Sequence, residues 1–198
     1  PAEPKELHFK VYVAGCPIPL SDVLPMLERM GLKVIGEVPY EIHPKREERP
    51  VWIHDFNMRH LGKEEIDNTS ALRGLFHEVF HEVWHGRMEN DGFNGLVLSA
   101  GLRAREIKVL RAYCKYLRQA QIPFSQSYME ETLARNPRLA RLLAELFMTR
   151  FDPAKRKGAE EREEELVAEI RGLLEEVSNL DEDRIIRRYL NLIRSTLR

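Results

Sequence analysis

The sequence has 198 residues, of which 43% are hydrophobic and 32% charged, with 31 Lys and Arg against 32 Asp and Glu. This composition excludes a wholly disordered chain, and the balanced charge disfavours a protein that binds nucleic acid through its overall charge. Two cysteines imply no disulfide framework, and no uncharged stretch approaches the ~20 residues of a membrane helix. We therefore expect a cytoplasmic protein without a membrane partner.

Both ends of the sequence resemble positions inside a longer polypeptide rather than natural termini. The chain opens at Pro1 without an initiator Met, and its last residues, NLIRSTLR, continue a helical pattern of apolar side chains. Natural termini more often end in polar residues. We expect a segment of a longer protein, and a small protein with a processed start is the alternative.

The first part of the chain alternates between strand and helix patterns. Residues 7–14 (LHFKVYVA) alternate in polarity, as a half-buried strand does. Ser21 is a candidate N-cap for a helix that ends at Gly31. Residues 32–42 and 51–56 predict two further strands, and the charged turn HPKREERP separates them.

After about residue 69 the sequence predicts helices. They are expected over 70–86, 91–101 and 103–120, and then from 125 and from 137. Residues 152–158 predict a linker, and 160–177 with 181–197 predict a final helical hairpin. We expect this hairpin to expose apolar side chains that a larger protein would cover, namely Ile186, Tyr189, Ile193 and Leu197.

The order of elements predicts an α+β fold. Strand, helix, strand, strand and helix form the start of a ferredoxin-like βαββαβ unit that lacks its last strand. The expected result is a small three-stranded antiparallel sheet with helices on one face, followed by a mostly helical region. We expect three parts: the βαββα module at 1–90, a helical region at 91–153, and a linker with the helical hairpin at 154–198.

The most conspicuous motif is H-E-V-F-H at 77–81, which fits the H-E-x-x-H pattern of zinc proteases and overlaps a second match at 81–85. Two histidines four residues apart on a helix can chelate a metal, while the glutamate activates water. His77, Glu78 and His81 are thus candidates for a zinc hydrolase. The continuation of the pattern would place a third histidine at 87 or 91, where other residues stand, although a later glutamate such as Glu106 could serve. On a helical wheel the histidines, with His85, border a core-facing arc, which favours packing or adventitious metal binding.

The predicted helix 103–118 is a second candidate site. It carries six Lys or Arg and one acid, with Tyr113 and Tyr116 interleaved, a composition that can meet nucleic-acid phosphates. A stand-alone interaction or nucleic-acid-binding module is therefore the alternative function. We expect instead that these cations pair with the acidic helix 160–176, which disfavours nucleic acid as a partner.

Other signatures of enzymes do not occur in the sequence. There is no dinucleotide-binding fingerprint, P-loop or nucleophile elbow. The acid–base pair His54-Asp55 is interpreted as residues of a strand-end turn. We therefore assign no catalytic, cofactor-binding or metal-binding residue.

Several stretches resemble a segment of the large bacterial NAD-dependent glutamate dehydrogenases. They are SDVLPMLERMGLKVIGEVPYEI (21–42) with VWIHDF (51–56), the stretch from DGFNG to RFDP (91–153), and SNLDEDRIIRRYLNLIRSTLR (178–198). The most specific part is LRAYCKYLRQ followed by PFSQSYME. The resemblance covers nearly the whole chain.

The resemblance implies a regulatory or structural segment upstream of the catalytic domain. The family converts L-glutamate and NAD to 2-oxoglutarate, ammonium and NADH, and the resemblance implies that the substrate and nucleotide sites lie outside this chain. NAD would belong to the parent enzyme, with no cofactor in this segment. The βαββα part is similar to an ACT-like module, which implies a candidate amino-acid effector at the turn 15–22. The implied partners are the rest of the parent chain and the other subunits of an oligomer.

Overall fold

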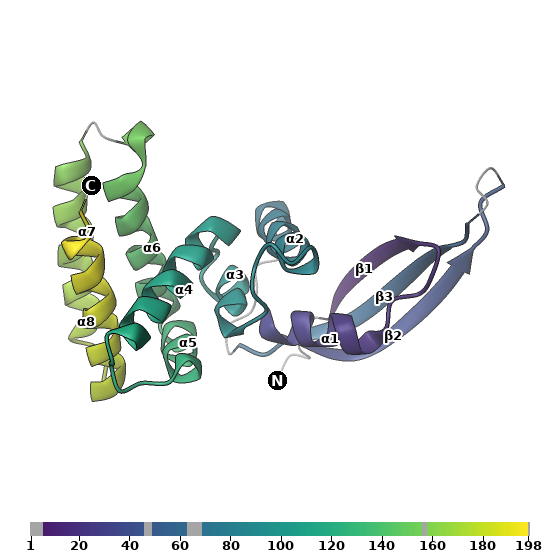
Figure 1. The fold of residues 1–198 in the computed structure, drawn as a ribbon, viewed down its shortest axis with the longest axis horizontal. Coiled ribbons are helices and arrows are strands. Elements are labelled where there is room, and N and C mark those ends of the chain that lie inside the picture. The colour runs from purple at the N-terminus through teal and green to yellow at the C-terminus, as the bar shows by residue number, and fades with distance from the viewer. Residues whose placement is uncertain (1–5, 46–48, 63–68, 156–157, 198) are drawn as a thin grey trace.

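The structure, a computed structural model, describes residues 6–45, 49–62, 69–155 and 158–197. The predicted charged turn at 43–50 and the predicted linker at 152–158 therefore lie partly outside the described residues. In chain order the elements are β1 (Leu7–Ala14), α1 (Leu20–Arg29), β2 (Leu32–Ile42), β3 (Val51–His60), α2 (Ser70–Trp84), η1 (Gly92–Gly95), α3 (Leu96–Ser99), α4 (Ala104–Gln119), α5 (Gln126–Arg135), α6 (Pro137–Phe151), η2 (Pro153–Lys155), α7 (Ala159–Leu174) and α8 (Leu180–Ser195). Figure 1 shows the sheet at one end of the molecule and α6–α8 at the other.

The described strands form one antiparallel sheet in the order β1-β3-β2, which confirms the predicted α+β fold class. The third strand is longer than predicted, because it continues from Phe56 to His60 and pairs there with β1 and β2. Phe56, the last predicted strand residue, and Met58 of the extension are both buried, so alternation of burial persists along it. The sequence did not predict this part of the strand, because the polar residues Asn57 and Arg59 flank Met58.

The two faces of the sheet have different environments. Phe56 and Met58 of the inner face share a core with Val23 and Leu27 of α1. On the outer face, the register places Tyr12 and Tyr40 on either side of Ile53, and both tyrosine side chains are exposed. The sheet is thus covered on one face, as predicted for strands of alternating polarity.

The segment predicted as one helix at 91–101 is instead the 3-10 turn η1 followed by the short helix α3. Asp91 caps η1, because its side chain accepts the N–H of Phe93. Gly95 lies where η1 meets the end of α1, and a Cβ there would lie 3.5 Å from the carbonyl oxygen of Arg29. This close approach joins the sheet module to the helices.

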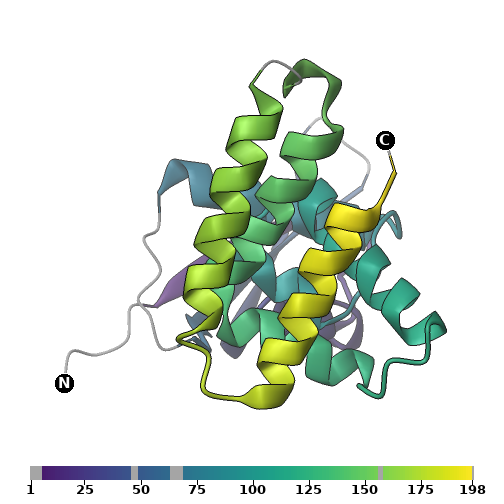
Figure 2. The same ribbon diagram turned by 90° about the vertical axis from the view of Figure 1, so that its left-hand side faces the viewer.

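The final hairpin is part of the core, contrary to our prediction. Ile186, Tyr189 and Ile193 are fully buried, and only Leu197 is exposed as expected, at 89%. The three buried positions are spaced by three and four residues, so they form one stripe along α8 that packs against α4, α5 and α6. Figure 2 looks onto this end of the molecule, with α7 and α8 foremost.

A continuous set of buried apolar side chains runs through both parts of the fold, from Ile18 before α1 to Ile193 in α8. The sheet module and the helices therefore share one core among the described residues. None of the described helices is long and apolar enough to cross a membrane.

Candidate functional site

The helix that carries the histidine motif, α2, is fixed by its N-cap and by one apolar face. The side chain of Thr69 accepts the N–H of Leu72 at 3.2 Å and so begins the helix. Phe76, Val79, Phe80 and Val83 are buried. The histidines of the motif follow the border of this face, as the helical wheel predicted.

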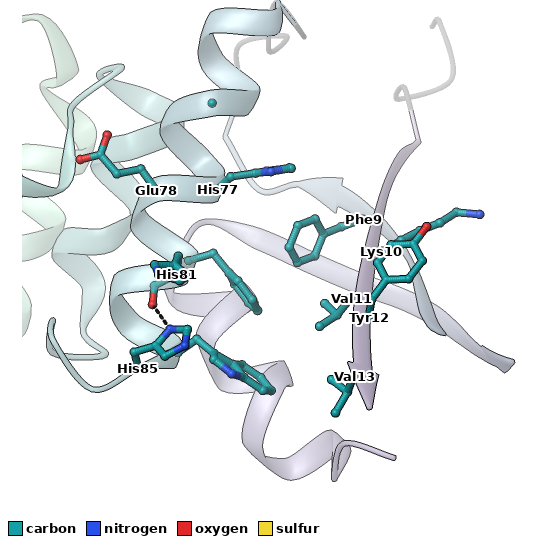
Figure 3. A pocket seen from close by; sticks show the side chains of 12 residues that line it. Phe9, Lys10, Val11, Tyr12, Val13, His77, Glu78, His81 and His85 are labelled. Carbon is teal, nitrogen blue, oxygen red and sulfur yellow. Dashed lines mark hydrogen bonds between the residues drawn. The ribbon is translucent and has the colours of Figure 1, made fainter. Parts of the chain in front are cut away.

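The three candidate zinc residues do not converge on one point. His77 points toward β1, where its ring meets the edge of Phe9 with centroids 5.7 Å apart. Glu78 lies on the side of α2 that faces away from β1 (Figure 3) and accepts the N–H of Ala104 at 3.3 Å. Glu78 therefore satisfies a free N–H at the start of α4.

His81 and His85 form a contact of their own. The Nδ1 of His85 donates to the carbonyl oxygen of His81 at 2.9 Å, and the ring centroids are 4.1 Å apart. Since a carbonyl oxygen can only accept, this bond fixes the proton on Nδ1. In the described part of the chain, no group of three or more His, Cys, Asp and Glu is arranged to hold a metal ion. The motif serves packing and helix capping.

A groove lies between β1 and α2. It has a volume of about 740 Å³ and is lined by five consecutive strand residues, Phe9 to Val13, and by residues of α2 that include His77, Phe80 and Trp84. A smaller hollow of about 320 Å³ continues it toward the start of β1, near Leu7 and Leu72. We call the two together the β1–α2 groove. Its walls are mainly aromatic and aliphatic.

His54 ties the sheet to the turn that precedes α1. It lies in the middle of β3 and is 2% exposed, so the interpretation of a strand-end turn is wrong. Its Nε2 accepts the N–H of Ile18 at 3.1 Å, and its Nδ1 bonds to the Glu37 carboxylate at 2.7 Å. The carboxylate needs a donor and Ile18 needs an acceptor, so this ring is neutral with its proton on Nδ1. The spacing of two residues from Trp52 to His54 and from His54 to Phe56 indicates that His54 shares the inner face of the strand with two aromatic residues. This spacing was the signal in the sequence for a buried, structural histidine.

Asp55, the neighbour of His54, lies on the opposite face of the sheet. Its carboxylate pairs with Lys10 at 3.1 Å and with His8 at 3.4 Å. Because consecutive residues of a strand point to opposite faces, His54 and Asp55 cannot act as one acid–base pair.

Three cations of α4 pair inside the molecule, but with different partners from those predicted. Arg111 is 5% exposed, and it donates to both carboxylate oxygens of Asp91 at 2.6 and 2.7 Å and to Asn94 Oδ1 at 2.7 Å. Lys108 pairs with Glu82 at 2.7 Å, and Lys115 pairs with Glu89. The acidic helix α7 instead uses arginines outside α4: Glu169 pairs with Arg138, and Glu163 with Arg150. The reason is positional, since α7 packs on α6 and α8.

A buried carboxyl lies beside this cluster. Glu130 accepts the N–H of Gly92 at 3.2 Å and the side-chain amide of Gln126 at 2.8 Å. Burial raises the pKa of Glu130 above its usual value. A Cβ at position 92 would lie 2.6 Å from a Glu130 carboxylate oxygen, so a larger residue there would have to displace this carboxylate. These groups hold η1 against α5.

The cysteines have contrasting environments. Cys16 is exposed after β1, whereas Cys114 is buried in α4 with its sulfur 3.9 Å from that of Met129. Burial raises the pKa of the Cys114 thiol to about 11. The buried Cys114 thiol therefore lacks the lowered pKa that a catalytic thiol requires.

The fold and these sites define a class: an ACT-like sheet module joined to a helical region, with its conspicuous polar residues engaged in packing, capping and internal pairing. Two family models match in this order. Residues 1–71 match "Glutamate dehydrogenase, ACT3 domain", and residues 88–153 match "Glutamate dehydrogenase, helical motif 3".

Relatives match over nearly the whole chain. The NAD-specific glutamate dehydrogenase of Halomonas elongata is 46% identical over 97% of this chain, that of Pseudomonas aeruginosa 42% over 98%, and that of Mycobacterium tuberculosis 38% over 94%. The chain belongs to the family of large NAD-specific glutamate dehydrogenases. It spans 12% of the length of each of these relatives.

Proposed function

We propose that the chain is the regulatory and structural segment of a large NAD-dependent glutamate dehydrogenase and does not itself catalyse the reaction. The parent enzyme converts L-glutamate and NAD to 2-oxoglutarate, ammonium and NADH in the cytoplasm. One observation carries the proposal: the ACT3 and helical motif 3 models match in order along a chain that spans 12% of its relatives. The partners of the segment are the rest of the parent polypeptide and the other subunits of its oligomer.

The contacts of the candidate residues are consistent with a structural role for the segment. Glu78 caps α4, His54 anchors the turn before α1, and Arg111 joins α4 to η1. Each of these side chains forms hydrogen bonds to other residues of the same chain. We also propose the division into a sheet module at 1–90, a helical region at 91–153 and a linker with hairpin at 154–198.

An amino-acid effector would bind at the turn 15–22. The bond from Ile18 to His54 links this turn to the middle strand of the sheet, so a ligand at the turn would act on β3. Calorimetric titration of the full enzyme with amino acids, before and after His54→Ala substitution, tests this part. Equal binding by both forms would place the effector elsewhere.

The test of the main proposal compares the isolated 198-residue chain with its full-length parent. We expect glutamate-dependent reduction of NAD by the parent and none by the isolated chain. Turnover by the isolated chain would show that it contains the chemistry, and a parent without glutamate dehydrogenase activity would remove the assignment to this reaction.

The alternative functions have separate tests. His77→Ala/His81→Ala should leave the zinc content of chelator-treated and reloaded protein unchanged, because the two side chains lack a converging third ligand. Binding to random duplex DNA should be weak, because the central cations of α4 are already paired. Stoichiometric zinc lost in the variant would favour the hydrolase, and DNA binding with a steep salt dependence would favour the nucleic-acid module.

A further inference from the structure

The outer side of β1 is a free strand edge. β1 pairs with β3 on one side, and on the other side it meets no strand from residues 6–45, 49–62, 69–155 or 158–197. The β1–α2 groove is lined by each residue from Phe9 to Val13 in turn. Residues of both faces of the strand contribute, so the hollow runs along the edge of β1.

Backbone groups on this edge are available for pairing. The N–H of Gly15 donates to the carbonyl oxygen of Pro50 at 2.8 Å, which directs the Gly15 N–H toward β3. Backbone groups of successive strand residues alternate in direction. The N–H and C=O groups of His8, Lys10 and Tyr12 therefore point to the free edge.

Helix α2 extends over the space beside this edge. Phe9, Val11 and Val13 point toward α2, as Figure 3 shows, and Phe9 already contacts Phe80 with ring centroids 4.9 Å apart. Beyond this contact the groove remains open between β1 and the α2 residues Trp84 and His85. A strand placed beside β1 would find a backbone partner in the sheet and an apolar cover for every second side chain.

The topology explains why none of the described strands lies in this place. In a βαββαβ unit the second helix returns to the sheet, and the right-handed crossover from β3 places the last strand on the far side of β1, antiparallel to it. Here the chain leaves α2 for η1 and α3 instead. Among the residues that the structure describes, the helix that would cover a fourth strand is thus present and the strand itself is not.

We propose that an extended segment of the parent polypeptide directly preceding residue 1 occupies the β1–α2 groove as a fourth, antiparallel strand paired with β1. The inference rests on the proposed membership in a longer enzyme, whose relatives have most of their length outside this chain. A segment that precedes β1 can turn back along it through a hairpin and gives the antiparallel direction that the edge requires. The end of the chain at α8 lies at the opposite end of the molecule from β1 (Figure 1), which disfavours a segment that follows it.

This mode of pairing predicts the character of the incoming segment. Main-chain hydrogen bonds to the β1 edge supply affinity, and alternate side chains enter the groove under α2. The segment should therefore carry apolar residues at every second position, directed toward Phe80 and Trp84, with polar residues between them.

Residue-resolved hydrogen exchange of the full-length parent and of the isolated 198-residue chain tests the proposal. We expect the amides of Lys10 and Tyr12 to exchange at least about tenfold more slowly in the parent, because they gain strand partners there. The amide of Phe56 in the middle strand should exchange equally in both. Equal exchange of Lys10 and Tyr12 in the two proteins would overturn the proposal.

A pair of variants of the parent separates strand pairing from general protection. Lys10→Pro removes the edge N–H and should abolish the slow exchange of Tyr12, whereas Lys10→Ala should retain it, and proline is tolerated at a strand edge. Unchanged exchange of Phe56 shows that the sheet remains folded. Slow exchange of Tyr12 in both variants would contradict strand pairing.

Two further outcomes are distinguishable. Protection of Tyr12 in the isolated chain that increases with protein concentration would assign the groove to a second copy of this chain and overturn the proposal. Failure of the proposed function itself is read from glutamate-dependent NAD reduction by the parent, which does not depend on the exchange of these amides.

Discussion

Glu78 and Glu82, the glutamates of the two overlapping H-E-x-x-H matches, both bond to α4. Glu78 accepts the N–H of Ala104, and Glu82 accepts from Lys108 at 2.7 Å and from Arg87 at 2.8 Å. The sequence pattern correctly predicted that both carboxylates lie on a helix. It did not reveal their partners, because Ala104 and Lys108 are separated from them by 26 residues and come close only through tertiary packing.

The acid titration of Glu82 gives a prediction at the same scale. Hydrogen bonds from Lys108 and then Arg87 lower the pKa of Glu82 from 4.5 to about 2. A lowered pKa stabilises the folded state above pH 4.5, and this contribution is lost as the pH falls from 4.5 to about 2. NMR titration of the Glu82 carboxyl should show the low midpoint, and Lys108→Met should raise it. An unchanged midpoint in Lys108→Met would contradict the ion pair.

The buried pair of Arg111 and Asp91 should contribute strongly to stability. Arg111→Ala leaves a carboxylate that is largely buried without its main partner, which typically costs about 3–5 kcal/mol of unfolding free energy. Urea denaturation measures this cost. Lys115→Ala, one turn further along α4, breaks a pair in which both side chains are about half exposed, and should cost about 1 kcal/mol or less. Equal costs for the two variants would show that Arg111 is not a structural centre.

Helix α8 shows what a periodic pattern can and cannot predict about an element. The spacing of its apolar residues correctly predicted a helix with one apolar stripe, but assigned the stripe to partners outside the chain. Whether a stripe is exposed depends on the elements that come to cover it, and here α4, α5 and α6 do so. The wrong partner predicted for the basic helix α4 has the same cause, because ion pairs between helices also depend on tertiary packing. The positions of strands and helices depend mainly on local patterns, and they were largely predicted.

A matched pair of substitutions tests the burial of α8. Ile193→Ala removes a fully buried side chain and should cost about 2–5 kcal/mol of unfolding free energy, whereas Leu197→Ala removes a side chain that is 89% exposed and should change it by about 0.5 kcal/mol or less. Thermal or urea unfolding of both variants provides the comparison. A small effect of Ile193→Ala would restore the original expectation of an exposed hairpin.

At the scale of the whole molecule, the shared core predicts cooperative unfolding. Both tryptophans, Trp52 in β3 and Trp84 in α2, lie at the sheet end, whereas most helical residues lie beyond them. Tryptophan fluorescence therefore reports mainly on the sheet module with α2, whereas far-UV circular dichroism reports mainly on the helices. Because buried apolar residues connect these parts, we expect the two probes to give the same unfolding midpoint. Separate midpoints would show that the sheet module and the helices fold independently.

The contrast between the two cysteines gives the chain a natural attachment point for a fluorophore. Cys16 is exposed just past the end of β1, and the thiol of Cys114 is shielded and has a pKa of about 11. A maleimide dye should therefore modify one thiol in the native protein and the second only after denaturation. Cys16 follows the end of β1 by two residues, and Val13 is the last strand residue that lines the β1–α2 groove. The emission of a dye on Cys16 should therefore change when another polypeptide binds along β1, without the need for an engineered cysteine.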